Sequence, residues 1–281
     1  MTMTETPNAA PATSPAAAPA STKPRSLALV TGASSGIGHD LAEVLAREGY
    51  DLVITARRAD ALASNAAEWE ARYRTRVHVV AVDLQQPDGP QQLFDQVQAA
   101  GLRPRILVNN AGVGVFGTFK DTPMGPDLGL MQLNMTSLVA VTKLFLPGVL
   151  AQRGRILNVA STAAYQPGPG MALYFASKAF VLHFSEALHA ELDRDGVSVT
   201  TLCPGPTTTG FKGAAGMDKS GLFRTPWVAT PMKVAEAGYR AMIEGKRECI
   251  PGLMNWMLAK GGAFMPRAMV IRLADVMMRE S

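Results

Sequence analysis

Cysteine is scarce in this sequence, and the cysteines it has do not form a recognisable site. Cys203 and Cys249 are the only two among 281 residues. They fit neither a disulfide framework nor the Cys/His spacing of a metal site. We therefore expect no bound metal and a location in the reducing cytoplasm.

An excess of charge of one sign is also lacking. The chain has 27 Lys and Arg against 23 Asp and Glu, which gives a net charge of +4, and the basic residues are scattered. Without a basic run or interleaved aromatic residues, the sequence predicts no nucleic-acid interface. No apolar run of about 18 residues is evident either, so we expect no membrane-spanning helix.

The first 24 residues lack the features of a secretory signal, because they have neither a basic start nor an apolar centre. They are rich in Ala, Pro, Thr and Ser, which bury too little apolar surface to fold. We expect residues 1–24 to form a disordered tail.

After this tail, short apolar segments alternate with helical patterns. Fully apolar strands between helices indicate a parallel sheet covered on both faces. We therefore predict an α/β, doubly wound (Rossmann) sheet of about seven strands in a single domain over residues 25–252. The predicted strands are 26–31, 51–56, 77–82, 105–110, 155–160, 197–203 and a seventh ending within 248–252; the predicted helices are 38–49, 59–74, 89–100, 126–152, 172–194 and 232–245.

The stretch TGASSGIG at 31–38 matches two different motifs. Residues 32–36 fit G-x-S-x-G, the nucleophile elbow of hydrolases, which would make Ser34 a nucleophile. The glycines instead fit a turn that lets backbone amides approach a phosphate at a helix N-terminus. A hydrolase also needs an acid and a histidine, and Asp83 and His183 follow in a permissible order. Any chain of this length offers such a pair, and the elbow leaves Gly38 unexplained.

A second motif, YFASK at 174–178, is more informative. Tyr174 and Lys178 are four residues apart and share one helix face. A nearby ammonium lowers the pKa of a phenol, which suits the tyrosine to acid–base work. Ser161 closes the preceding strand, where its hydroxyl can hydrogen-bond a carbonyl oxygen. Alone, the pair also fits an ordinary helix surface.

Taken in order, these and other motifs resemble the short-chain dehydrogenase/reductase (SDR) family in its single-domain form of about 250 residues. The resemblance covers roughly residues 25–250, and each motif is weak alone but the ordered set is specific. The motifs are TGASSGIG, Asp83-Leu84, NNAG at 109–112, Asn134, Ser161, YFASK and Pro204-Gly205. On this interpretation the elbow match is a coincidence.

The resemblance implies a role for each catalytic residue. Tyr174 would be the general acid–base, and Ser161 would hold and polarise the substrate oxygen. Lys178 would lower the pKa of Tyr174 and hydrogen-bond the nicotinamide ribose. Asn134 would anchor a water that links Lys178 to solvent.

The resemblance also implies a cofactor site. Asp83 would contact the adenine, and the row of threonines at 207–209 does not reveal which of them contacts the cofactor. The expected cofactor residues are Gly32, Ser34, Ser35, Gly36, Ile37, Gly38, Arg57, Arg58, Asp83, Leu84, Asn110, Ala111, Gly112, Tyr174, Lys178, Pro204, Gly205, Thr207 and Thr209.

The end of the second strand, ITARR, bears on the choice of cofactor. An acidic residue there would bind a ribose 2′-hydroxyl and repel a 2′-phosphate. Here Ala56 takes that place, and Arg57 and Arg58 follow. Guanidinium groups bind phosphate well, so we predict NADP(H) in preference to NAD(H). The alternative is a solvated strand end.

Loops at the carboxyl ends of the strands carry mostly apolar residues, which predicts a pocket for an apolar ketone, aldehyde or alcohol. Residues 206–228 are rich in glycine and fit either a mobile lid or a plain surface loop. The expected pocket residues are Val113, Val115, Phe116, Tyr165, Met171 and Phe211.

The last segment, 253–281, is predicted to be an amphipathic helical extension. It fits a cap on the pocket, a contact with another subunit or a membrane surface, and packing on its own domain is favoured. The family resemblance implies a homodimer or homotetramer built on helices near 126–152 and 172–194. The expected apolar face is Met269, Val270, Leu273, Val276 and Met277.

The sequence thus predicts an NADP(H)-dependent oxidoreductase that interconverts a ketone or aldehyde and an alcohol. A non-catalytic NADP(H)-binding or redox-sensing protein on the same fold is the alternative, because fold alone does not fix function. The presence of all four residues Asn134, Ser161, Tyr174 and Lys178 argues against it. A serine hydrolase using Ser34 is a third class.

Overall fold

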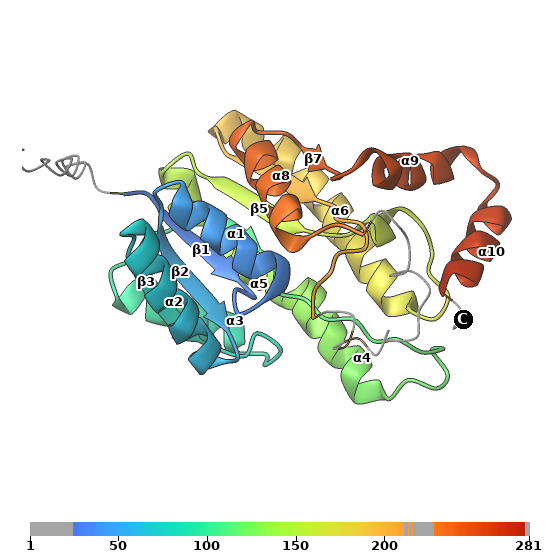
Figure 1. The fold of residues 1–281 in the computed structure, drawn as a ribbon, viewed down its shortest axis with the longest axis horizontal. Coiled ribbons are helices and arrows are strands. Elements are labelled where there is room, and N and C mark those ends of the chain that lie inside the picture. Colours follow the sequence, from blue (N-terminus) through green and yellow to red (C-terminus); the bar gives the residue numbers. More distant parts are fainter. Residues whose placement is uncertain (1–24, 211–212, 214, 216–227, 279–281) are drawn as a thin grey trace, which may run out of the picture.

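The computed structural model describes residues 25–210, 213, 215 and 228–278. A parallel sheet lies at the centre of the described part, as Figure 1 shows. Its strand order is β3-β2-β1-β4-β5-β6-β7, so the order reverses between β1 and β4. This confirms the predicted doubly wound architecture. The strands are β1 (Leu27–Thr31), β2 (Asp51–Ala56), β3 (Val77–Ala81), β4 (Ile106–Asn109), β5 (Arg155–Val159), β6 (Ser198–Leu202) and β7 (Glu248–Cys249).

Helices cover both faces of this sheet. Along β1, Ala28 and Val30 belong to one apolar cluster and Leu29 to the other, because alternate side chains of a strand point to opposite faces. The first cluster contains side chains of α1 (Gly36–Arg47), α2 (Ala59–Tyr73) and α8 (Pro231–Ile243). The second contains side chains of α3 (Gly89–Ala99), α5 (Leu138–Ala151) and the end of α6 (Ala172–Leu192).

The helix expected over 126–152 is a composite of three elements. It consists of α4 (Met124–Met131), a π-helical turn η1 (Gln132–Ser137) and α5. Contrary to the expectation from the sequence, the stretch Met124–Ala151 is long and apolar enough to span a membrane, with a hydropathy of 1.5. This criterion uses length and composition only. Because Val141, Phe145 and Val149 pack in the sheet core, we assign α5 to the fold.

The end of the chain differs from the single amphipathic helix expected from the sequence. It contains α9 (Leu253–Gly261), a short 3-10 turn η5 (Gly262–Phe264) and α10 (Arg267–Met278). In α10 the buried side chains are Val270, Ala274 and Met278, whereas Met269 and Leu273 are exposed. The favoured expectation, that the apolar face packs on its own domain, was therefore largely wrong. The tail 1–24 and most of 206–228 lie outside the described residues.

A chain of buried polar side chains joins the sheet to the helices beneath it. The Asn109 amide donates to Thr142 Oγ1 at 2.9 Å and to Asn158 Oδ1 at 2.9 Å. Asn158 in turn donates to Ser185 Oγ at 2.8 Å. This hydrogen-bond network links β4 and β5 to α5 and α6, and it gives each of its buried side chains a partner, as a buried polar network requires.

We expect Asn158→Ala to lower the free energy of unfolding by about 2–3 kcal/mol, because it removes two buried hydrogen bonds and leaves a cavity. Urea denaturation measures the change. Gln92→Ala, which removes an exposed side chain of α3, is the control and should stay within about 0.5 kcal/mol of the wild type. Equal stabilities of the two variants would contradict the structural role of the network.

Candidate active site

A cavity of about 630 Å³ lies at the carboxyl ends of the strands. In open parallel sheets this edge is where ligands bind, next to the reversal of strand order. The structure brings together at this cavity all the predicted site residues except Asn134. They are Gly32, Ser34, Ser35, Gly36, Ile37, Gly38, Arg57, Arg58, Asp83, Leu84, Asn110, Ala111, Gly112, Ser161, Tyr174, Lys178, Pro204, Gly205, Thr207 and Thr209.

The turn between β1 and α1 has the geometry of a phosphate cradle. Gly32 has φ of +69° and Gly36 has φ of +62°, which side chains rarely tolerate. A Cβ on Gly38 would lie 2.2 Å from Asn110 Nδ2 and 2.4 Å from the Gly32 carbonyl oxygen. The side chain of Ser35, the first residue before α1, does not cap the helix, so the first amides of α1 suit an anion. These residues fit the phosphates of a dinucleotide.

Ser34 does not have the surroundings of a hydrolase nucleophile. Its hydroxyl accepts a hydrogen bond from Arg58 Nη2 at 3.2 Å. The His183 side chain is exposed and lies 3.7 Å from Glu186, and His183 is not among the residues that line the cavity. A nucleophile needs a base within hydrogen-bond reach, and the described residues offer Ser34 a guanidinium instead.

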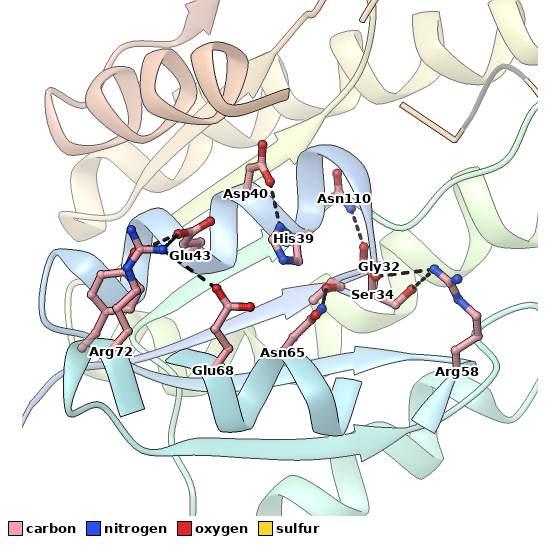
Figure 2. A network of polar contacts seen from close by, with 12 residues as sticks. Gly32, Ser34, His39, Asp40, Glu43, Arg58, Asn65, Glu68, Arg72 and Asn110 are labelled. Atoms are coloured by element: carbon pink, nitrogen blue, oxygen red, sulfur yellow. Dashed lines mark hydrogen bonds and ion pairs between the residues drawn. The ribbon is translucent and has the colours of Figure 1, made fainter. Parts of the chain in front are cut away.

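The two arginines after β2 point to different partners. Arg58 reaches the glycine turn, where its Nη2 contacts Ser34 and lies 3.1 Å from Ser35 Oγ (Figure 2). Arg57 Nη1 instead contacts Gln85 Oε1 at 3.2 Å. Adjacent residues at a strand end point to opposite sides, so only one of the pair reaches the turn. Arg58 is therefore the better placed cation for a phosphate beside Ser34.

Figure 2 also shows a group of possible metal ligands on α1. The ligand atoms of His39, Asp40 and Glu43 lie within 4.8 Å of one another. His39 Nδ1 and Asp40 Oδ1 are 2.8 Å apart, and Glu43 Oε1 accepts hydrogen bonds from Arg72 and Tyr73. These contacts already occupy the ligand atoms, so we assign no metal to this group.

The candidate catalytic side chains come from α6 and the end of β5. Tyr174 and Lys178 share one face of α6, and the Lys178 Nζ lies 5.7 Å from the centroid of the Tyr174 ring. Lys178 donates to the Val159 carbonyl oxygen at 2.9 Å. Ser161 hydrogen-bonds the Tyr174 phenol and accepts from the Ala163 amide at 3.1 Å. A hydroxyl pair and an ammonium thus meet at one wall of the cavity.

Burial dominates the acid–base properties of this group. It raises the pKa of Tyr174 to about 12, while the hydrogen bond from Ser161 acts in the opposite direction. It also lowers the pKa of Lys178 to about 8. The sequence predicted a lowered pKa for Tyr174 because of Lys178. The direction is the reverse in the protein alone, because desolvation of the phenolate outweighs the other effects.

Asn134 lies behind the cavity wall, on the π-helical turn η1. Its side chain is only 1% exposed. Oδ1 accepts from the Val113 amide, and Nδ2 donates to the Val113 carbonyl oxygen, both at 2.9 Å. Nδ2 also donates to Ser177 Oγ at 3.0 Å. Asn134 therefore fastens the loop after β4 to α6 at Ser177, the residue directly before Lys178.

Gly112 is the residue that lets this loop approach Asn134 and Lys178. A Cβ at this position would lie 3.2 Å from Asn134 Oδ1 and 3.5 Å from Lys178 Nζ. These two distances show that Asn134 and Lys178 both lie close to the point where a side chain of residue 112 would begin.

The predicted apolar pocket is only partly assembled as expected. Val113 and Met171 line the cavity, and Phe116 packs against the cluster around Met171. Tyr165 points away, where its hydroxyl donates to Glu248 Oε1 at 2.5 Å. Val115 is not among the lining residues, and Phe211 lies outside the described residues. Lining residues that the sequence analysis missed include Gln166, Phe175, Ala274 and Met278.

Helix α9 supports the cavity from behind. Lys260 Nζ contacts Glu248 at 2.8 Å and lies 4.8 Å from the centroid of the Tyr165 ring. The buried Asn255 side chain packs against Gly205, where a Cβ would lie 2.3 Å from Asn255 Oδ1. The turn at Pro204-Gly205, which lines the cavity, is therefore held by a helix beyond the sheet.

The pH dependence of stability tests the burial of Lys178. The folded pKa of about 8 lies below the ordinary 10.5, so the unfolded chain binds more protons between these values. The free energy of unfolding of the wild type should therefore rise by about 3 kcal/mol relative to Lys178→Met as pH rises from about 8 to 10.5. Denaturation at several pH values measures this. Lys120→Met, at an exposed lysine, is the control, and parallel curves for the wild type and Lys178→Met would refute the assignment.

Known proteins with similar sequences include oxidoreductases. The probable oxidoreductase EphD of Mycobacterium tuberculosis is 36% identical over 197 residues, which are 69% of this chain and 33% of that protein. The chain thus spans about a third of the length of this relative.

Solved structures with the same fold include complexes with NADPH and with NAD. A short-chain dehydrogenase from Sphingobium yanoikuyae in complex with NADPH has a TM-score of 0.76 and 31% identity, covering 85% of this chain and 94% of that one. A short chain dehydrogenase/reductase from Burkholderia phymatum in complex with NAD has a TM-score of 0.76 and 25% identity, covering 84% and 92%.

A model of one protein family covers most of the described fold. It matches residues 26–220, from the start of β1 to beyond β6, and it is the model for short chain dehydrogenases. The family resemblance deduced from the motifs is thereby confirmed, and the chain belongs to the short chain dehydrogenase family.

Proposed function

We propose that this chain is an NADP(H)-dependent oxidoreductase that interconverts an apolar ketone or aldehyde and its alcohol. One observation carries the proposal: a single cavity contains both the glycine cradle and the group of Ser161, Tyr174 and Lys178. A nicotinamide dinucleotide, when bound in the cradle, supplies the hydride that such a reduction needs.

The side chains of this site hold the carbonyl group and supply the proton that the reduction needs besides the hydride. Ser161 holds the carbonyl oxygen by a hydrogen bond, and the Tyr174 hydroxyl gives its proton to that oxygen as negative charge develops there. With a pKa of about 12, Tyr174 is protonated at neutral pH and is ready to donate. The phenolate that remains lies beside the Lys178 ammonium and regains its proton from solvent. In oxidation the same proton moves in the reverse direction.

The environment of the reacting group suits an apolar substrate. Met171, Phe175 and Met278 line the cavity close to Tyr174 and form one apolar cluster. Gln166 is a polar lining residue in the same region. Apolar walls with few polar groups are typical of sites that bind small organic molecules.

Arg58 supports the choice of NADP(H). Its guanidinium lies over Ser34 and Ser35, in the turn that would hold the phosphates next to the adenosine ribose of the dinucleotide. A 2′-phosphate there would meet a cation and two hydroxyls, and Ala56 stands at the end of β2 where an acid would repel it.

Arg58→Ala should weaken the binding of NADPH roughly 10- to 100-fold and the binding of NADH little, because a charge-assisted contact is worth about 1.5–3 kcal/mol. Fluorescence titration with both nucleotides measures this. Arg57→Ala is the matched control, and we expect a smaller effect on NADPH because Arg57 contacts Gln85. An equal loss for NADPH and NADH in Arg58→Ala would defeat the NADP(H) assignment.

Tyr174→Phe should slow carbonyl reduction about 10²- to 10⁴-fold while nucleotide binding is kept, because it removes only the proton donor. A panel of apolar ketones and aldehydes, followed by NADPH absorbance, measures the rate. Tyr73→Phe, which removes a hydroxyl bonded to Glu43 outside the cavity, is the control. An undiminished rate in Tyr174→Phe would rule out the proposed mechanism.

These measurements also separate the other function classes. A non-catalytic nucleotide-binding protein would bind NADPH and reduce no member of the panel. A serine hydrolase would lose its activity in Ser34→Ala, whereas a reductase using Tyr174 would keep most of its rate. We further propose a cytoplasmic homo-oligomer that assembles through α5 and α6.

A further inference from the structure

Exposed large apolar side chains gather on the last two helices. Of the seventeen such side chains among the described residues, eleven lie between residues 253 and 276, so they are not scattered over the surface. Phe264 is 90% exposed and Leu253 is 74% exposed. We define the C-terminal apolar surface by Leu253, Trp256, Phe264, Met269, Leu273 and Val276.

Helix α9 has the opposite orientation to an ordinary surface helix, whereas α10 buries the apolar Val270, Ala274 and Met278 and is also apolar on its outer side. Asn255 and Ala259 are the buried residues of α9, so this helix faces the protein with a polar and a small side chain. Its large apolar side chains, such as Trp256, point outward. A helix that is apolar all round is normally covered on all sides. The outer side of α9 and α10 therefore calls for a partner, and Figure 1 shows both helices at one end of the molecule, beyond α6.

The charges around this surface are almost all positive. Between residues 250 and 278 the chain has Lys260, Arg267 and Arg272 but only one acidic residue, Asp275. Lys260 pairs with Glu248. Arg267 and Arg272 are exposed, and neither forms an ion pair with another described residue. The apolar surface is thus flanked by two arginines that are available to an anionic partner.

We propose that the C-terminal apolar surface docks onto an anionic lipid bilayer. Apolar side chains enter the interface while Arg and Lys contact anionic headgroups, and Trp is enriched at this depth. A second copy of the chain fits less well, because a two-fold contact would bring the same arginines of both copies together. The proposal is independent of the proposed activity.

The same helix that would meet the lipid also forms part of the cavity wall. Ala274 and Met278 on the inner side of α10 line the cavity, whereas Leu273 and Val276 belong to the outer side. Docking would therefore bring the apolar end of the cavity close to the bilayer. The core of the fold would remain outside the membrane, since only α9, η5 and α10 carry this surface.

The experiment is co-sedimentation of the full chain with vesicles of phosphatidylcholine containing about a third phosphatidylglycerol, compared with phosphatidylcholine alone. We expect the wild type to sediment with the anionic vesicles and to bind the neutral ones at least tenfold more weakly. The double variant Trp256→Glu/Phe264→Glu and the double variant Arg267→Glu/Arg272→Glu should each lose at least tenfold in binding to the anionic vesicles.

Phe119→Glu is the matched control, since it replaces an exposed aromatic side chain outside this surface and should keep full binding. Circular dichroism and thermal unfolding of each variant report an intact fold. A wild type that stays in solution with anionic vesicles overturns the proposal. So does an oligomer that dissociates in Trp256→Glu/Phe264→Glu when the wild type binds no vesicles, because a second copy would then cover the surface.

Discussion

The hydrogen bonds of the Asn110 amide hold the site together. Nδ2 donates to the carbonyl oxygens of Thr31 and Gly32 at 3.0 and 3.3 Å, and so ties the end of β4 to the end of β1. These strands are the pair between which the strand order reverses. Gly38 lies so close to the same amide that no side chain fits there. The contact therefore determines where the first amides of α1 point, and with them the position of any bound phosphate.

The second constraint is the cost of burying charge beside a cavity. Lys178 is almost fully buried, and its ammonium has the Val159 carbonyl as a partner instead of a carboxylate. Burial without a counter-ion keeps its pKa low, and burial of the neighbouring phenol keeps that pKa high. Burial thus shifts both groups toward their neutral forms in the protein alone, and a pKa of about 8 still leaves Lys178 an ammonium at neutral pH. A ligand that brings charge into the cavity would change this balance, which couples binding to protonation.

The sequence predicted those features that depend on local pattern. Buried parallel strands are apolar along their whole length, and the glycines of 31–38 stand where a close approach requires them, so both were recognised. Features that depend on which way a side chain points were not recognised. Arg57 and Arg58 are neighbours, and only the backbone at the end of β2 decides which one reaches Ser34. In α10 both sides are apolar, so periodicity selected the exposed Met269 and Leu273 as the inner face.

The cavity wall formed by α10 comes from a part of the chain that is separate from the family motifs. The family match ends at residue 220, whereas Ala274 and Met278 come much later. Changes of side-chain size at these two positions alter the shape of the cavity without changing the residues of the glycine turn or of the YFASK motif. The shape of this wall can therefore diverge during evolution while both motifs stay the same. The same separation makes α10 a convenient place to redesign selectivity.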